Sequence, residues 1–103
     1  MKIKTIDINA KEWFDRINGN SYFSAQITIN YGMKTAKAFS LPFQYGYGSH
    51  YLDISMKALI EKGFIKNARE REAIWQYCND NKIILRYSKE ENCLKRDVVA
   101  FGA

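Results

Sequence analysis

The sequence predicts a single α+β domain in which an antiparallel sheet of about five strands packs with about three helices. Two observations support this class. Residues 20–43 alternate between apolar and polar side chains with a period of two, and apolar stripes with helical spacing lie before and after them. The chain has 103 residues, of which 47% are hydrophobic, so it can bury a core of its own. Because no linker or repeat divides it, residues 1–103 are treated as one domain.

The N-terminal segment predicts a strand followed by a helix. Residues 2–8 alternate isoleucines with polar side chains, which favours a short strand. The next four residues resemble a capping box, with Asn9 accepting from the first turn and Glu12 reaching back. Apolar residues then recur at helical spacing, namely Ala10, Trp13, Phe14 and Ile17. These features predict a helix over residues 10–17 that ends at Gly19.

The alternation after Gly19 is the clearest strand signal in the chain. One face is apolar and consists of Phe23, Ala25, Ile27, Ile29 and Tyr31. The other face is mostly polar and consists of Tyr22, Ser24, Gln26, Thr28 and Asn30. A turn around Gly32 follows, and residues 34–43 return as a second strand, so the two segments predict a β-hairpin with Lys34 and Lys37 near its tip.

The second half predicts two helices and a second hairpin. A helical stripe runs from residue 52 to Gly63, and a second capping-box pattern at residues 67–70 predicts a helix that reaches Cys78. Residues 82–88 and 93–101 are rich in β-branched and aromatic side chains and flank a charged turn. The expected order is therefore strand, helix, two strands, two helices, two strands.

The junction between the first hairpin and the following helix, LPFQYGYGSHYLD, is the most distinctive stretch. Its glycines permit a sharp turn, and Ser49 is the expected helix N-cap. Its aromatic side chains cannot easily all point inward, and exposed tyrosines favour recognition. The predicted binding residues are Tyr45, Gly46, Tyr47, Gly48, Ser49, His50 and Tyr51. Two alternatives remain, a tyrosine cluster packed over the sheet end and an anion site at the helix N-terminus.

The residue types predict neither a metal site nor a cofactor, and they give little support to catalysis. His50 is the single histidine, and Cys78 and Cys93 lack the spacing of zinc ligands. No paired carboxylates stand out, although a Cys–His pair remains an alternative. The two cysteines are expected to be free thiols in a reducing cytoplasm. No signal peptide or apolar span is apparent, so no membrane partner is expected.

A net charge of +5 favours anionic partners. The basic residues of the second half form a candidate nucleic-acid patch, namely Lys62, Lys66, Arg69, Arg71, Lys82, Arg86, Lys95 and Arg96. Glutamates and an aspartate lie among them, and the alternative is an ordinary solvated surface.

Two stretches, WFDRINGNSYFS and PFQYGYGSHYL, resemble a family of small proteins found in phage and prophage sequences. The resemblance covers about the first half of the chain. It implies a phage-type origin, a setting in the cytoplasm of an infected bacterium, and no activity that can be carried over. The expected function is that of a non-catalytic inhibitor of a host defence complex, similar to anti-CRISPR proteins. The alternatives are a nucleic-acid-binding accessory protein of phage replication or recombination and, third, a small enzyme.

Overall fold

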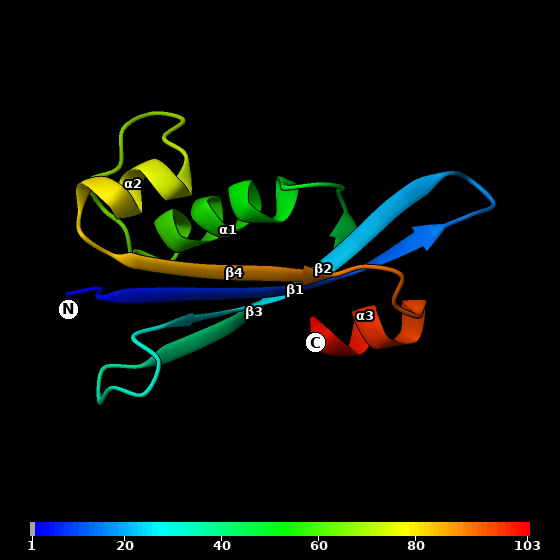
Figure 1. The fold of residues 1–103 in the computed structure, drawn as a ribbon, viewed down its shortest axis with the longest axis horizontal. Helices are drawn as coiled ribbons and strands as arrows, with labels where there is room; N and C mark the ends of the chain where they lie inside the picture. The colour runs from blue at the N-terminus through cyan, green and yellow to red at the C-terminus, as the bar shows by residue number, and fades with distance from the viewer. Residues whose placement is uncertain (1) are drawn as a thin grey trace.

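In the computed structural model, which describes residues 2–103, four strands form one mixed sheet with helices packed on both faces (Figure 1). The elements in chain order are β1 (Thr5–Asp15), β2 (Asn20–Ile29), β3 (Lys37–Tyr45), α1 (His50–Glu61), α2 (Ile74–Asp80), β4 (Ile84–Glu90) and α3 (Lys95–Phe101). The predicted α+β class is confirmed. The sheet differs from the prediction because it has four strands, in the order β3-β2-β1-β4, and because β4 runs parallel to β1.

The sheet is built around the long β1–β2 hairpin, with β3 antiparallel to β2 on one side and β4 on the other. Helices α1 and α2 lie on one face and α3 lies on the opposite face (Figure 1). The main core fills the space under α1 and α2. Its largest fully buried side chains include Ile6 and Ile8 from β1, Ile27 from β2 and Leu59 from α1.

The predicted first hairpin is confirmed by the pairing of β2 with β3. Its apolar face is buried from Phe23 to Ile29, as the alternation requires. The strand and its alternation end at Ile29, two residues before the predicted end at Tyr31, because Asn30 has a positive φ of 55°. Asn30 is therefore fully buried, whereas Tyr31 is 71% exposed and does not belong to the apolar face.

The helix predicted over residues 10–17 is wrong, since β1 continues to Asp15 and residues 16–19 form the hairpin turn. Residues 10–15 also alternate with a period of two, and Ala10 and Glu12 are buried on the same face as Ile8. Ladder pairing with β2 extends from Ile6 to Asp15 and satisfies the backbone groups of both strands. The longer antiparallel ladder therefore overrides the local helical signal.

The strand predicted over residues 93–101 is also wrong, because residues 95–101 form α3. The helix buries Val98 completely against the sheet, and the Ser24 hydroxyl donates to the Val98 carbonyl at 2.5 Å. A Cβ on Gly102 would lie 2.6 Å from the carbonyl oxygen of Leu41. The absence of a side chain at Gly102 thus lets the end of α3 approach β2 and β3 closely.

The helix after the junction is confirmed as α1, while the next helix starts later than predicted. Residues 67–73 are not helical, and α2 begins at Ile74 with Ala73 as its N-cap residue. Ser49 occupies the N-cap position of α1, but its side chain makes no capping hydrogen bond. Among the described residues, no helix is long and apolar enough to cross a membrane.

Candidate functional site

The junction between β3 and α1 depends on two glycines that have different physical roles. Gly46 is buried, and a Cβ there would lie 2.6 Å from Cε1 of Phe23 and 2.7 Å from Cδ2 of His50. Gly48 faces open space but has a φ of +60°, which disfavours residues with side chains. The first glycine permits close packing and the second permits the turn.

The structure places the predicted binding side chains in different environments. Tyr45 and Tyr47 are 56% and 68% exposed, respectively. Tyr51 is only 6% exposed and belongs to the core, so the expectation of an outward-facing ring is wrong at this position. The His50 side chain is exposed on one side and packs edge-on against Phe23, with the ring centroids 6.3 Å apart. Two of the three junction tyrosines therefore remain accessible to a partner.

A buried ion pair fixes the junction to the sheet. Lys89 Nζ on β4 lies 3.0 Å from Glu12 Oε1 on β1, and both side chains are about nine-tenths buried. The same ammonium group donates to the Gly48 carbonyl at 2.8 Å and lies 5.8 Å from the centroid of the Tyr51 ring. A lysine at this depth needs such partners, because an uncompensated buried charge is strongly destabilising. We refer to this arrangement as the Lys89 brace.

The Lys89 brace was not found from the sequence, although one signal was present. Glu12 falls on the core-facing side of the alternation that continues from Ile6 and Ile8, so a carboxylate there requires a cation. The identity of that cation depends on the parallel pairing of β4 with β1, which sets Lys89 opposite Ala10. Because Glu12 and Lys89 are 77 residues apart in the sequence, no local pattern indicated their contact.

Four aromatic rings form a cross-strand cluster on the sheet face that carries α3. Trp13 stacks on Tyr22 with centroids 5.7 Å apart, and Tyr22 stacks on Phe43 at 5.2 Å. Tyr45 contacts Tyr22 edge-on at 5.8 Å. A register shift opposite Ser24 gives β3 one extra residue, which puts Phe43 and Tyr45 beside Tyr22. We call Trp13, Tyr22, Phe43 and Tyr45 the aromatic ladder.

The β1–β2 turn extends beyond α1 (Figure 1). Exposed apolar side chains lie in and beside this turn. Ile17 is 93% exposed and Phe14 is 45% exposed. The Asp15 carboxylate accepts hydrogen bonds from the backbone N–H of Ile17 and Asn18 and from the Asn18 side chain. The bond from the Asn18 side chain is the main reason that the pKa of Asp15 is lowered. The turn is thereby held in one conformation.

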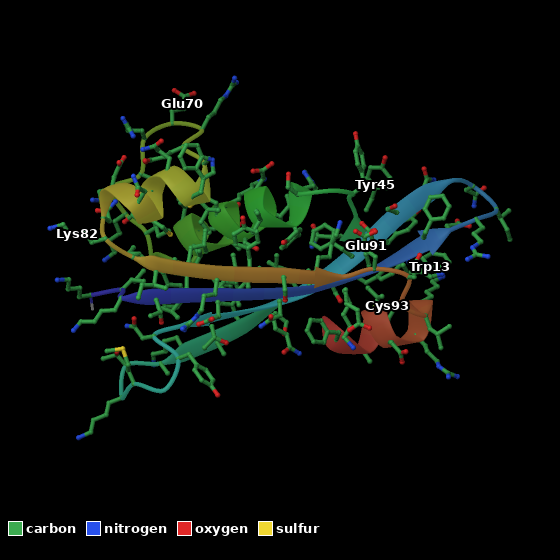
Figure 2. All side chains as sticks on the ribbon, in the orientation of Figure 1. Trp13, Tyr45, Glu70, Lys82, Glu91 and Cys93 are labelled. Atoms are coloured by element: carbon green, nitrogen blue, oxygen red, sulfur yellow. The ribbon has the colours of Figure 1, made fainter. Side chains whose placement is uncertain are left out.

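We define the arm end as Phe14, Ile17, Tyr45 and Tyr47, of which Tyr45 also belongs to the aromatic ladder. Figure 2 labels Trp13 and Tyr45 at this end of the sheet. The four defining side chains are among the large apolar residues that remain exposed. Sequence reasoning identified Tyr45 and Tyr47 but missed Phe14 and Ile17, because it assigned them to a buried helical stripe.

The predicted basic patch is not gathered on one surface. Arg69 pairs with Glu72 at 3.1 Å and with Asp80 at 3.0 Å, and Arg86 pairs with Asp7 at 2.6 Å. Lys95 lies 5.2 Å from the Trp13 ring centroid near the arm end. The remaining members are exposed and come from separate segments, namely Lys62, Lys66, Arg71, Lys82 and Arg96.

The two cysteines are free thiols in different surroundings. Burial raises the pKa of Cys78 to about 11, so its thiol is neutral at physiological pH and packs as a small apolar group. Cys93 is partly buried and its thiol donates to the Glu90 carbonyl at 3.4 Å. Within residues 2–103, no three His, Cys, Asp or Glu side chains cluster closely enough to hold a metal ion.

Comparisons of the chain with protein-family models, with curated proteins and with solved structures found no match. The resemblance to small phage proteins therefore stays a prediction. Functional inference for this chain rests on the geometry described above.

Proposed function

We propose that this chain is a non-catalytic binding protein that docks onto a partner protein through its arm end. The observation that carries the proposal is that four large apolar side chains are exposed at one end of the sheet, above all Ile17 at 93% exposure. Large apolar side chains in water are unfavourable, and a cluster of them on a small protein is typical of an interaction surface. Tyrosine adds rigid contact area with a polar tip.

The arm end is also rigid before any partner arrives. The aromatic ladder links three strands, Asp15 holds the hairpin turn, and the Lys89 brace fixes the junction loop. A surface that is already ordered loses little conformational entropy when it binds. Preorganised apolar anchors of this kind favour tight docking onto a complementary pocket.

A host defence complex is the partner that we propose, as in anti-CRISPR-type inhibition. The support comes from where the two resembling stretches lie in the fold. WFDRINGNSYFS spans residues 13–24 and forms the hairpin turn with its flanking strands, while PFQYGYGSHYL spans residues 42–52 and forms the adjoining strand end and junction. The stretches that resemble phage proteins are thus those that build the arm end.

The proposal is tested with two isoleucines that are matched in type but lie at different places. Ile17 is at the arm end, and Ile84 on β4 is 59% exposed away from it. Immobilised wild type, Ile17→Ser and Ile84→Ser are used to capture proteins from nuclease-treated lysate of a bacterium that carries the defence complex. Loss of an apolar hot spot weakens binding roughly 10- to 30-fold. We expect Ile17→Ser to lose a partner that the wild type and Ile84→Ser retain.

A captured defence subunit that depends on Ile17, together with restored phage growth on cells expressing the wild type, would support the assignment. Identical capture by both variants would remove the arm end as the docking surface. Thermal unfolding of each variant controls for loss of folding, and exposed substitutions of this kind should leave stability nearly unchanged.

A further inference from the structure

Seven exposed lysines gather at the end of the molecule opposite the arm end. They are Lys2, Lys4, Lys34, Lys37, Lys62, Lys66 and Lys82. They come from the residues before β1, the loop between β2 and β3, the start of β3, the segment after α1 and the turn before β4. Figure 2 labels Lys82 at this end, close to the N-terminus marked in Figure 1. We call this set the lysine end.

Buried hydrogen bonds show why these distant segments meet. The Asn30 side-chain oxygen accepts from the Lys4 backbone N–H at 2.7 Å, and its amide donates to the Lys2 carbonyl at 3.0 Å and to Thr35 at 3.1 Å. The backbone N–H of Ile84 donates to the Lys4 carbonyl at 3.0 Å. Fully buried Asn30 therefore ties the start of the chain to the loop that carries Lys34.

The segment after α1 closes the other side of this end. Lys62 Nζ lies 4.9 Å from the centroid of the Phe39 ring, which stacks on Phe64 at 6.0 Å. Lys2 and Lys66 line one cavity of about 540 Å³, and Tyr77 is also in its wall. The Tyr77 hydroxyl donates to Asn67 Oδ1 at 2.7 Å. The cavity and its flanking lysines thus form a fixed, polar surface.

The seven lysines outnumber the acids of the segments that carry them, where the exposed carboxylate of Glu61 adjoins Lys62. None of the seven lysines forms an ion pair with an acid among residues 2–103. Nearby Asp80 is occupied by Arg69 at 3.0 Å and by Gln76 at 2.9 Å. Unpaired like charges grouped on one surface produce a positive potential that attracts polyanions.

We propose that the lysine end binds the phosphate backbone of a nucleic acid. Lysines are compact, strongly hydrated charges, and they lie here on several separate segments. A row of phosphates can contact several such charges together, whereas a single small anion cannot. Contacts to backbone phosphates carry no base information, so binding through these lysines should be independent of sequence. The sequence pattern found only part of this surface. It included Lys62, Lys66 and Lys82 in the candidate patch but not the lysines of the first half, which are far from them along the chain.

This inference is independent of the arm end, because the two surfaces lie at opposite ends of the molecule. If both proposals are correct, the partner is a nucleoprotein. The arm end then binds its protein component and the lysine end binds its nucleic acid. The two can fail separately, since Ile17→Ser leaves the lysine end unchanged.

The test measures binding to a duplex of about 20 base pairs and mixed sequence, at about 50 and 200 mM salt. Each phosphate contact contributes a slope of about −0.9 to log K against log salt, so three or four contacts predict a roughly 40- to 150-fold loss over this range. The triple variant Lys4→Gln, Lys34→Gln and Lys66→Gln should bind about tenfold more weakly at low salt and show a shallower slope.

A matched control removes the same charge elsewhere, with Arg16→Gln, Lys57→Gln and Arg96→Gln together. It should weaken binding by less than about threefold, because it changes only the long-range field. Equal losses in the two triple variants, or no duplex binding at about 50 mM salt, would overturn the proposal. Binding to vesicles that contain anionic lipid, without binding to the duplex, would also overturn it and indicate a membrane surface.

Discussion

The arm end and the lysine end of the sheet differ in what makes them suitable for a partner. At the arm end, β1 and β2 extend past α1 (Figure 1). Apolar side chains there stay exposed, and the Lys89 brace and the aromatic ladder support the surrounding backbone. At the lysine end, backbone segments are tied together by Asn30, but the lysine side chains themselves are unpaired within residues 2–103. Recognition at the first depends on shape, and recognition at the second depends on summed charge.

This difference has a consequence for mutation. Shape depends on a few packed residues, so single changes at the buried contacts that support the arm end should affect stability as well as binding, whereas changes at its exposed side chains should affect binding alone. Summed charge is spread over many solvated side chains, so single changes at the lysine end should have small effects. Three substitutions test this contrast, from the largest expected effect to the smallest.

The Lys89→Ala change should have the largest effect on folding. It leaves the Glu12 carboxylate buried without its cation and removes the donor to the Gly48 carbonyl. Breaking a buried pair in this way lowers the free energy of unfolding by about 3–5 kcal/mol. Urea unfolding measures the loss, with Lys66→Ala as a control at the lysine end. A loss below about 1 kcal/mol would mean that the brace does not fix the junction.

Glycine substitutions compare the two ends directly. Gly46→Ala places a Cβ 2.6 Å from the buried Phe23 ring, whereas Gly32→Ala in the loop before β3 meets nothing within 4 Å. We expect overpacking at residue 46 to cost about 1–3 kcal/mol of stability. The positive φ of +78° at Gly32 should make its substitution cost about 1 kcal/mol. Thermal unfolding of both variants provides the measurement, and a larger loss at residue 32 would reverse the comparison.

The Asp15→Ala change should have the smallest effect on global stability while loosening the arm end. Without the carboxylate, the backbone N–H groups of Ile17 and Asn18 lose their acceptor. We expect faster amide exchange at these two residues and an almost unchanged melting temperature. Asp15→Asn is the control, since its side-chain oxygen can still accept.

Lowering the pH of the wild-type protein should loosen the hairpin turn in the same way as Asp15→Ala. The pKa of Asp15 is lowered in the folded protein, so the contribution of its carboxylate is present above the ordinary value of 3.8. It is lost as the pH falls through the lowered pKa. Amide exchange at Ile17 that stays slow through this titration would show that the turn does not depend on the carboxylate.

The local sequence pattern was sufficient to predict an element where its apolar residues followed a single period, either that of a strand or that of a helix. The β2–β3 hairpin, α1 and the strand in residues 84–90 were predictable because apolar residues there follow a single spacing and turns flank them. The exposed rings of Tyr45 and Tyr47 were predictable because too many aromatic residues occupy one short loop. The burial of Tyr51 was not predictable, because it depends on which face of α1 meets the sheet.

The local sequence pattern predicted the wrong element where a segment was compatible with both a helix and a strand. Residues 10–15 fit both a helix and a strand, and the β2 ladder decided between them. Residues 95–101 contain two adjacent valines typical of a strand, yet the small surface offered by Ser24 and Gly102 allows a helix to pack there. In both cases a partner distant in the chain determined the local conformation.

The sequence alone determined the α+β class, the first hairpin and an aromatic, glycine-containing junction, because these depend on neighbouring residues. Tertiary structure decided the parallel pairing of β4, the pairing of Glu12 with Lys89, and the gathering of seven lysines from separate segments at one end. The physical reason is that burial and charge clustering are properties of surfaces. In this protein, each of these surfaces is assembled from segments that are far apart along the chain.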